Sequence, residues 1–123
     1  MLCRRRRRKL CIRNKSSLMN YKFNEDKLLN EVTKYVDNTY KQHYAQGNFQ
    51  ATEIIMDAKH GRGFCMGNII KYAIRFDKKG DGREDLLKII HYALLGMHQL
   101  DVEEKQLYDE LKEYENQLYI DKD

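Results

Sequence analysis

Apolar residues recur at intervals of three and four along most of this chain, and no proline interrupts them. That interval places successive side chains on one face of an α-helix, whereas proline breaks helices. No segment alternates apolar and polar residues with the period of a β-strand. The sequence therefore predicts an all-α fold, a small helical bundle of about five helices. The first apolar stripe consists of Leu28, Leu29, Val32, Val36 and Tyr40.

Capping and turn residues set the expected helix boundaries. Asn24 is a candidate N-cap, and Glu25 and Asp26 suit the positive end of a helix that runs to about residue 40. A loop is expected over 61–63, and the glycine-rich stretch 78–82 is the clearest turn. Two further cap signals are Asp81 with Glu84 and Asp101 with Glu104. The remaining helices are expected at about 51–58, 64–77, 82–97 and 101–118.

Residues 1–18 differ from the rest of the chain in charge. They hold eight basic residues and no acid, while the remaining chain has 15 basic and 19 acidic residues, a net charge of −4. One interpretation is an arm, Arg4–Arg8 above all, that binds nucleic acid nonspecifically through phosphate groups. The other is a disordered basic leader, or an upstream start used in place of Met19. We expect this leader to precede a single helical domain over residues 19–123.

Several classes of protein are disfavoured by what the sequence lacks. It has no phosphate-binding P-loop and no cysteine–histidine spacing suited to zinc. It also lacks the paired acidic helices with which all-helical pyrophosphatases hold magnesium, so no metal site is expected. No apolar run is long enough to span a bilayer, and we expect no membrane partner. Cys65 is expected to be a small buried hydrophobe.

The helix expected at 64–77 carries a polar stripe. Asn68, Lys71, Tyr72 and Arg75 stand at i, i+3, i+4 and i+7, which puts them on one face. Arginine binds phosphate through two parallel bonds, lysine adds a point charge, and an amide can contact a base or sugar. Gly67 would let a ligand approach the backbone closely. The alternative is an ordinary solvated face with surface ion pairs.

Two other groups of polar residues could complete such a site. Asp85, Lys88 and Tyr92 share a face of the next helix, where Asp85 could orient Lys71 or Arg75, or accept a proton from a substrate. Alternatively, Glu84 and Asp85 simply stabilise the helix N-terminus.

A second polar and aromatic pair, His43 and Tyr44, could stack on a base, although a histidine near a helix end is often a capping or packing residue.

The middle of the chain resembles the SaV-like family of small phage proteins, which includes a phage nucleoside-monophosphate kinase. The resemblance covers about residues 43–99 and centres on Gly67-Asn68-x-x-Lys71-Tyr72-x-x-Arg75. The other matching residues are His43-Tyr44, the run Ala51–Ile55, Lys79-Gly80, Glu84-Asp85-Leu86-x-Lys88 and Tyr92.

The resemblance implies a deoxynucleoside-monophosphate kinase without a P-loop. It also implies a nucleotide substrate, a nucleoside triphosphate as phosphoryl donor with no bound cofactor, the cytoplasm of an infected host cell, and a homo-oligomer. We expect catalytic roles for Lys71, Arg75 and Asp85. Nucleotide-binding roles are expected for His43, Tyr44, Gly67, Asn68, Tyr72, Lys79, Lys88 and Tyr92.

Two other functions remain open. One is a viral protein that binds or sequesters nucleotides without turnover. The other is an interaction protein that uses the helix at 101–118, whose apolar residues Leu107, Leu111, Tyr114 and Leu118 have a 4-3-4 spacing.

Overall fold

The computed structural model describes residues 19–46, 48–78 and 80–120, with side chains over 19–42, 51–78 and 80–120. The basic leader, residues 1–18, and Lys79 lie outside the described residues. The chain divides into two compact units, Met1–Asp37 and Asn38–Asp123. Each unit is described by itself.

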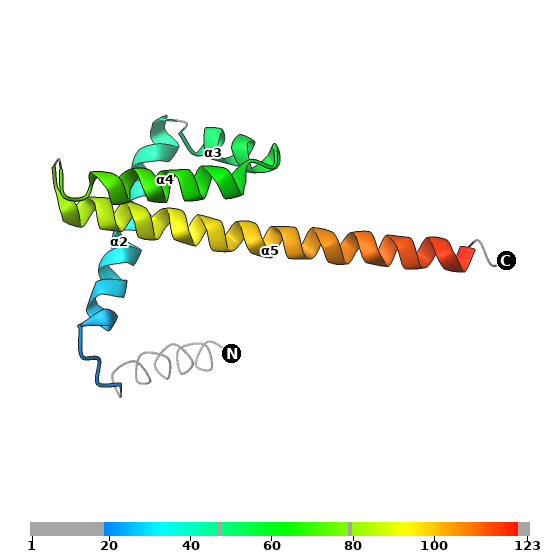
Figure 1. Ribbon diagram of the computed structural model, residues 1–123, viewed down its shortest axis with the longest axis horizontal. Helices are drawn as coiled ribbons and strands as arrows, with labels where there is room; N and C mark the ends of the chain where they lie inside the picture. Colours follow the sequence, from blue (N-terminus) through cyan, green and yellow to red (C-terminus); the bar gives the residue numbers. More distant parts are fainter. Residues whose placement is uncertain (1–18, 47, 79, 121–123) are drawn as a thin grey trace, which may run out of the picture. The chain divides into compact units, whose positions relative to one another are not determined.

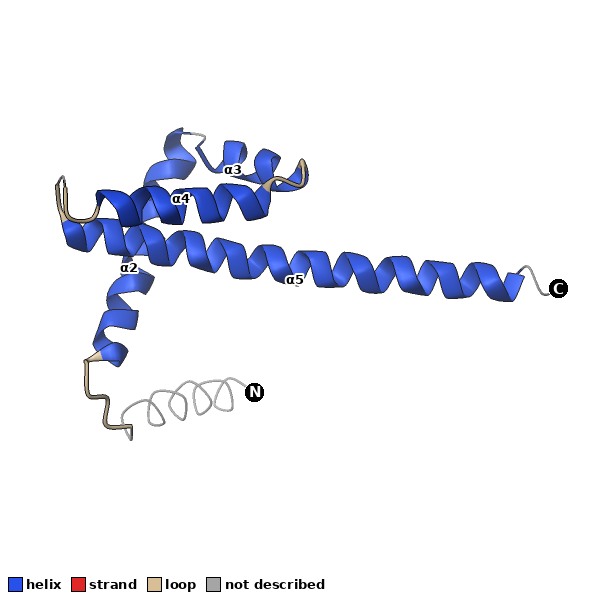
Figure 2. Cartoon of the chain, in the orientation of Figure 1, coloured by secondary structure: helices blue, strands red, loops and turns tan. Residues whose placement is uncertain are grey.

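Four helices make up the described structure: α2 (Glu25–Gln46), α3 (Asn48–Asp57), α4 (Gly61–Arg75) and α5 (Gly82–Ile120). Figure 2 shows helices joined by loops, with no strand among the residues it colours. The predicted all-α fold is therefore confirmed. The predicted number of helices, about five, is wrong because the last two expected helices form one.

The first helix begins where the sequence predicts and extends six residues further. The carbonyl oxygen of Asn24 accepts a 3.0 Å hydrogen bond from the amide of Leu28, and α2 starts at the next residue, Glu25. In the first unit, Val32 is the buried apolar residue of this helix, with 8% of its surface exposed. The helix continues across the boundary between the two units at 37/38.

The α5 helix runs for 39 residues through the position where a new helix was expected. Asp101 and Glu104 have the residue types of an N-cap and its partner, but the preceding residues are already helical. Gln99 is buried, and its side chain donates a 3.2 Å hydrogen bond to Glu103, one turn further along the same helix. This bond spans the expected break, so the local capping signal is overridden.

Residues Gly61-Arg62-Gly63, expected to be a loop, instead form the first turn of α4. Gly61 is buried, and a Cβ atom at this position would lie only 2.7 Å from Oε1 of Gln99 on α5. The glycine therefore lets two helices approach closely, and it does not serve as a turn residue here.

The described residues of the predicted turn at 78–82, which leave out Lys79, and the cap that follows agree with the prediction. Gly80 has a φ of 79°, a left-handed conformation that favours glycine. The side chain of Asp81 accepts a 3.0 Å bond from the amide of Arg83, and its carbonyl accepts one from the amide of Asp85. Asp81 therefore caps α5, which begins at Gly82.

Helices α4 and α5 pack side by side in opposite directions (Figure 1). Small residues permit the close approach, since a Cβ atom on Gly96 would contact Cβ of Cys65 at 3.7 Å. Cys65 is 1% exposed, as expected of a buried hydrophobe, and burial raises the pKa of its thiol. The two buried residues of α5, Asp85 and Gln99, are both polar. Buried polar side chains therefore lie toward both ends of this helix pair, Asp85 near Arg75 and Gln99 near Gly61.

A salt bridge joins the start of α4 to the middle of α5. Arg62 Nη2 lies 2.6 Å from Glu103 Oε2, and Arg62 Nε donates to both carboxylate oxygens, at 3.0 and 2.8 Å. The hydrogen bonds from Arg62 and then from Gln99 lower the pKa of Glu103. This contact fixes the register of the two helices where α4 begins.

None of the described helices combines the length and apolar composition needed to cross a membrane.

We predict opposite effects for two glycines in one helical turn. Gly61→Ala should lower the free energy of unfolding by about 1–2 kcal/mol, because its methyl group displaces Gln99. Gly63→Ala, with no atom within 4 Å of the added Cβ, should raise it by up to about 1 kcal/mol through helix propensity. Urea unfolding monitored by circular dichroism measures both. Equal effects of the same sign would contradict the close approach at Gly61.

We also predict a pH-dependent contribution from Glu103. Its pKa in the folded protein lies below the ordinary value of 4.5, so its ionised form stabilises the fold above that pH. That contribution is lost as the pH falls through the lowered pKa. The urea midpoints of the wild type and Glu103→Gln should therefore differ most near neutral pH and converge in acid. Glu104→Gln is the control, and a gap for Glu103→Gln that widens in acid would refute the assignment.

Candidate functional site

Two tyrosines form the centre of the candidate site. Tyr72 of α4 and Tyr92 of α5 stack with their ring centroids 6.0 Å apart and their planes 17° apart. Phe64, two turns before Tyr72, meets the Tyr92 ring edge-on at 5.6 Å. Both tyrosines are half-buried between the helices. The aromatic rings thus hold α4 and α5 together and still present part of their surface.

Three cations surround the ring of Tyr72. The side-chain nitrogens of Lys71 and Lys88 lie 5.0 and 5.1 Å from its centroid, and the guanidinium carbon of Arg75 lies 5.5 Å from it. These distances are typical of cation–π contacts. We call these four residues, together with Asp85 and Tyr92, the Tyr72 cluster.

Asp85 is the most deeply buried member of the Tyr72 cluster. Its side chain is 0% exposed, and its Oδ1 lies 3.3 Å from Nε of Arg75, which is 44% exposed. Neither carboxylate oxygen has a hydrogen-bond partner among the described residues. Arg75 is therefore the cation that balances this buried charge, and Asp85 in turn holds the guanidinium beside Tyr72.

Lys71 is the cation most available to a ligand. Lys88 lies 3.6 Å from Glu84, one turn earlier on α5, and Arg75 lies against Asp85. No ion pair joins Lys71 to a carboxylate in the described part of the chain, and its side chain is exposed. A phosphate arriving here would therefore find one cation without a competing acid.

The structure places the other predicted residues of α4 less favourably. Asn68 is half-buried, and its amide nitrogen donates a 2.8 Å hydrogen bond to the carbonyl of Phe64. Gly67 is exposed, and a Cβ there would meet nothing within 4 Å. No neighbouring segment of the described chain therefore requires glycine at this position. The expected role of Gly67, to let a ligand approach the backbone closely, stays a prediction.

Three predicted residues cannot be placed at the site. The backbone of His43 and Tyr44 belongs to α2, but their side chains lie outside the described residues. Lys79 lies outside them altogether. Within the described ranges, no group of three or more histidine, cysteine, aspartate or glutamate residues could hold a metal ion.

Pairing across the two helices was predicted only in part from the sequence. Contact of Asp85 with Arg75 was one of the expected possibilities. The edge-on contact of Phe64 with Tyr92 was not predicted, because the rotation of the two helices about their axes is not set by local spacing. One signal was present, because Phe64, Asn68 and Tyr72 follow one another at intervals of four. That stripe faces α5, so Asn68 and Tyr72 of the predicted polar face lie partly in an interhelical surface.

A family model, that of DUF3310, described as proteins of unknown function, matches residues 38–94. The matched segment runs from the last turns of α2 through the first third of α5 and includes the Tyr72 cluster and all other predicted site residues. The match covers 57 of 123 residues, just under half of the chain. No curated protein and no solved structure matches the chain.

We predict that the contribution of Arg75 to the stability of the helix pair depends on the side chain of Asp85. Arg75→Met should destabilise the fold by about 1–3 kcal/mol, less than a fully buried pair would, because Arg75 is partly exposed. In an Asp85→Asn background the same change should cost less than about 0.5 kcal/mol. Urea unfolding of the four proteins gives this double-mutant cycle. Additive effects would show that the two side chains act independently.

Proposed function

We propose that the Tyr72 cluster binds a nucleotide and that the protein transfers a phosphoryl group from a nucleoside triphosphate to a deoxynucleoside monophosphate. The observation that carries this proposal is the gathering of Lys71, Arg75 and Lys88 within 5.5 Å of one aromatic ring. Cations favour phosphate groups, and an aromatic surface favours a base. The resemblance to the SaV-like family supports the same chemistry.

The cations have distinct roles in this mechanism. An oxygen of the acceptor's phosphate attacks the γ-phosphorus of the donor, and the bond from that phosphorus to its bridging oxygen breaks. Two nucleoside diphosphates result. Negative charge shifts toward the bridging oxygen during the transfer, and Lys71 and Arg75 stabilise it. Lys88 and the two tyrosines hold the nucleotide in place.

Asp85 acts as a positioning residue in this proposal. Of the two roles expected for it, orienting a cation agrees with its complete burial and its contact with Arg75. A monophosphate has a second pKa near 6, so the attacking oxygen is largely ionised at neutral pH. The transfer therefore needs no general base.

The proposed setting is that of a phage protein in the cytoplasm of an infected host cell, acting on nucleotide pools as a homo-oligomer. Self-association has support in the exposed apolar surface. Val32 and Cys65 are the apolar residues that are fully buried in the described structure, while many large ones are exposed. Such surface is typical of a protein that packs against another chain.

The second candidate is a protein that binds nucleotides without turnover. It needs the same cations and no transfer chemistry, and the burial of Asp85, which leaves the Tyr72 cluster without an accessible carboxylate, agrees with it. A diphosphate-formation assay with ATP and each deoxynucleoside monophosphate separates the two functions. Binding without product would favour this candidate and refute the kinase.

We predict that Arg75→Ala lowers turnover by about 100-fold or more, because a contact to transition-state charge contributes roughly 3–4 kcal/mol. Lys71→Ala should weaken nucleotide binding, measured by calorimetry, more than Lys105→Ala, which removes a lysine from the exposed surface of α5 far along the chain. Unchanged turnover in Arg75→Ala, or equal binding by the two lysine variants, would remove these residues from the site.

A further inference from the structure

Helix α4 carries an apolar stripe on the side opposite α5. Met66, Ile70 and Ile74 follow at intervals of four and are 56%, 53% and 62% exposed. Gly61, Cys65 and Tyr72, which face α5, lie on the other side of the helix. We call Met66, Ile70 and Ile74 the outer stripe. All three side chains stay exposed within the described part of Asn38–Asp123, although α3 also contacts α4.

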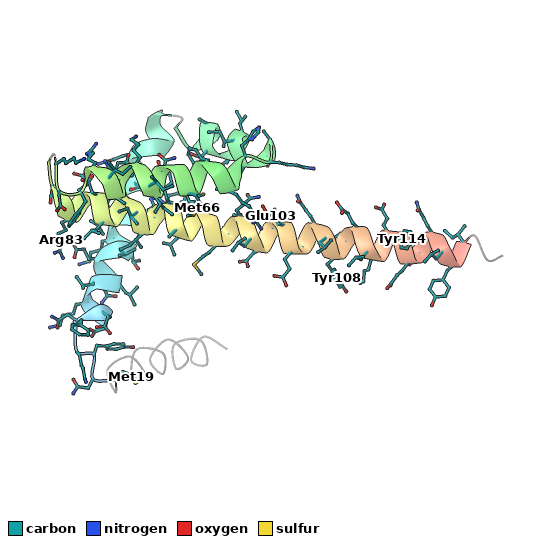
Figure 3. The ribbon with its side chains drawn as sticks, in the orientation of Figure 1. Met19, Met66, Arg83, Glu103, Tyr108 and Tyr114 are labelled. Carbon is teal, nitrogen blue, oxygen red and sulfur yellow. The ribbon has the colours of Figure 1, made fainter. Side chains whose placement is uncertain are left out.

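The end of α5 carries a second uncovered stripe. Beyond Glu103, every side chain of α5 is exposed, and the helix continues past the start of α4 (Figure 1). Figure 3 shows side chains near Tyr108 and Tyr114 projecting from this part of α5 with no helix of the same unit beside them. We call residues 104–120 the stem. Its stem stripe consists of Leu107, Leu111, Tyr114 and Leu118, which are 45–61% exposed.

The two chain segments that contain the stripes have net charges of opposite sign. The segment 61–78, which contains α4, has four basic residues and one acid, a net charge of +3. The segment 101–120 has seven acids and two lysines, a net charge of −5. In helical projection, Lys71 lies beside the outer stripe, and Glu110 and Glu115 flank the stem stripe. The exposed Lys78 follows in the turn after α4. Each stripe therefore has the flanking charges that suit the other.

Pairing of one stem with another stem lacks this complementarity. If the stem stripe formed a parallel coiled coil with a second copy, Leu107 and Tyr114 would occupy d positions and Leu111 an a position. Glu110 would then be a g residue facing Glu115, an e residue, of the other helix. Like charges would face each other along the seam, and an antiparallel pair would also bring two segments of net charge −5 together.

We propose that the stem of one copy docks on the outer stripe of a second copy, in a head-to-tail contact. This proposal specifies the surface used for the proposed self-association and does not depend on nucleotide binding. The exposed parts of the seven side chains amount to on the order of 700 Å² of apolar surface. This area is below the roughly 1,200 Å² at which stable interfaces begin, so each single contact is of the weak, reversible class. Each copy presents both surfaces, so the contact repeats around a ring or along a chain.

Complementation between two variants of the full chain tests the contact. Ile70→Asp disables the outer stripe and Leu111→Asp disables the stem stripe, so each variant alone should be monomeric by light scattering. In an equimolar mixture, the intact stem of Ile70→Asp can dock on the intact outer stripe of Leu111→Asp, and a 1:1 heterodimer should form. A stem-to-stem contact predicts instead that Ile70→Asp stays assembled and that mixing restores nothing, which would overturn the proposal.

Charge reversal gives an independent test in case an introduced aspartate disturbs the fold. Lys78→Glu should weaken self-association at least tenfold, and adding Glu110→Lys in the same chain should recover most of the loss. Wild-type assembly should also weaken between about 50 mM and about 500 mM salt, since the attraction is screened. Assembly that strengthens with salt, or is unaffected by Lys78→Glu, overturns the head-to-tail contact. A monomeric wild type overturns self-association as well, and neither result bears on nucleotide binding.

Discussion

The balance of charge at Asp85 is the constraint on which the α4–α5 pair depends. A carboxylate with no exposed surface needs a nearby cation, and Arg75 at 3.3 Å is the one that the structure provides. Arg75 lies at the end of α4, and Asp85 lies in the first turn of α5. Their contact therefore spans the turn between the two helices and fixes how the helices begin their packing. The stack of Tyr72 on Tyr92 and the contact of Gly61 with Gln99 continue that packing in the same register.

This packing departs from the usual distribution of side chains in a helix pair. The two buried residues of α5 are an aspartate and a glutamine, whereas Leu86, Ile90, Leu94 and Met97 are exposed. Leu87, Ile89 and Leu95 are half-buried. Polar groups between helices define a single register, because each must meet its own partner. The apolar faces are then left for contacts with other elements or other chains. A ligand site formed by the Tyr72 cluster and an assembly formed through the outer faces can therefore coexist in one small protein.

The sequence predicted the features that depend on near neighbours. Helical periodicity gave the all-α fold, the acidic first turn placed the start of α2, and Asp81 marked the start of α5, because these signals act within about four residues. The loop expected at Gly61 and the helix start expected at Asp101 were wrong for one shared reason. Both depend on Gln99, which packs on Gly61 and bonds to Glu103.

The same distinction applies to the candidate site. Spacing on α4 correctly brought Lys71, Tyr72 and Arg75 together, since residues three and four apart are neighbours on a helix. The complete burial of Asp85 depends on the rotation of α5 about its axis relative to α4, which cannot be predicted from local spacing. The side chains of His43 and Tyr44 lie outside the described residues, so their part in the site stays a prediction.

The unbroken α5 helix has a mechanical consequence. At 1.5 Å per residue, the segment from Glu103 to Ile120 extends about 25 Å beyond the last anchor on α4. A rigid rod of that length acts as a lever, and a rotation of about 5° at the anchor would displace its tip by about 2 Å. Small adjustments around Gln99 are thereby magnified at the far end of the helix. The same rod would carry a disturbance at its tip back toward the aromatic pair.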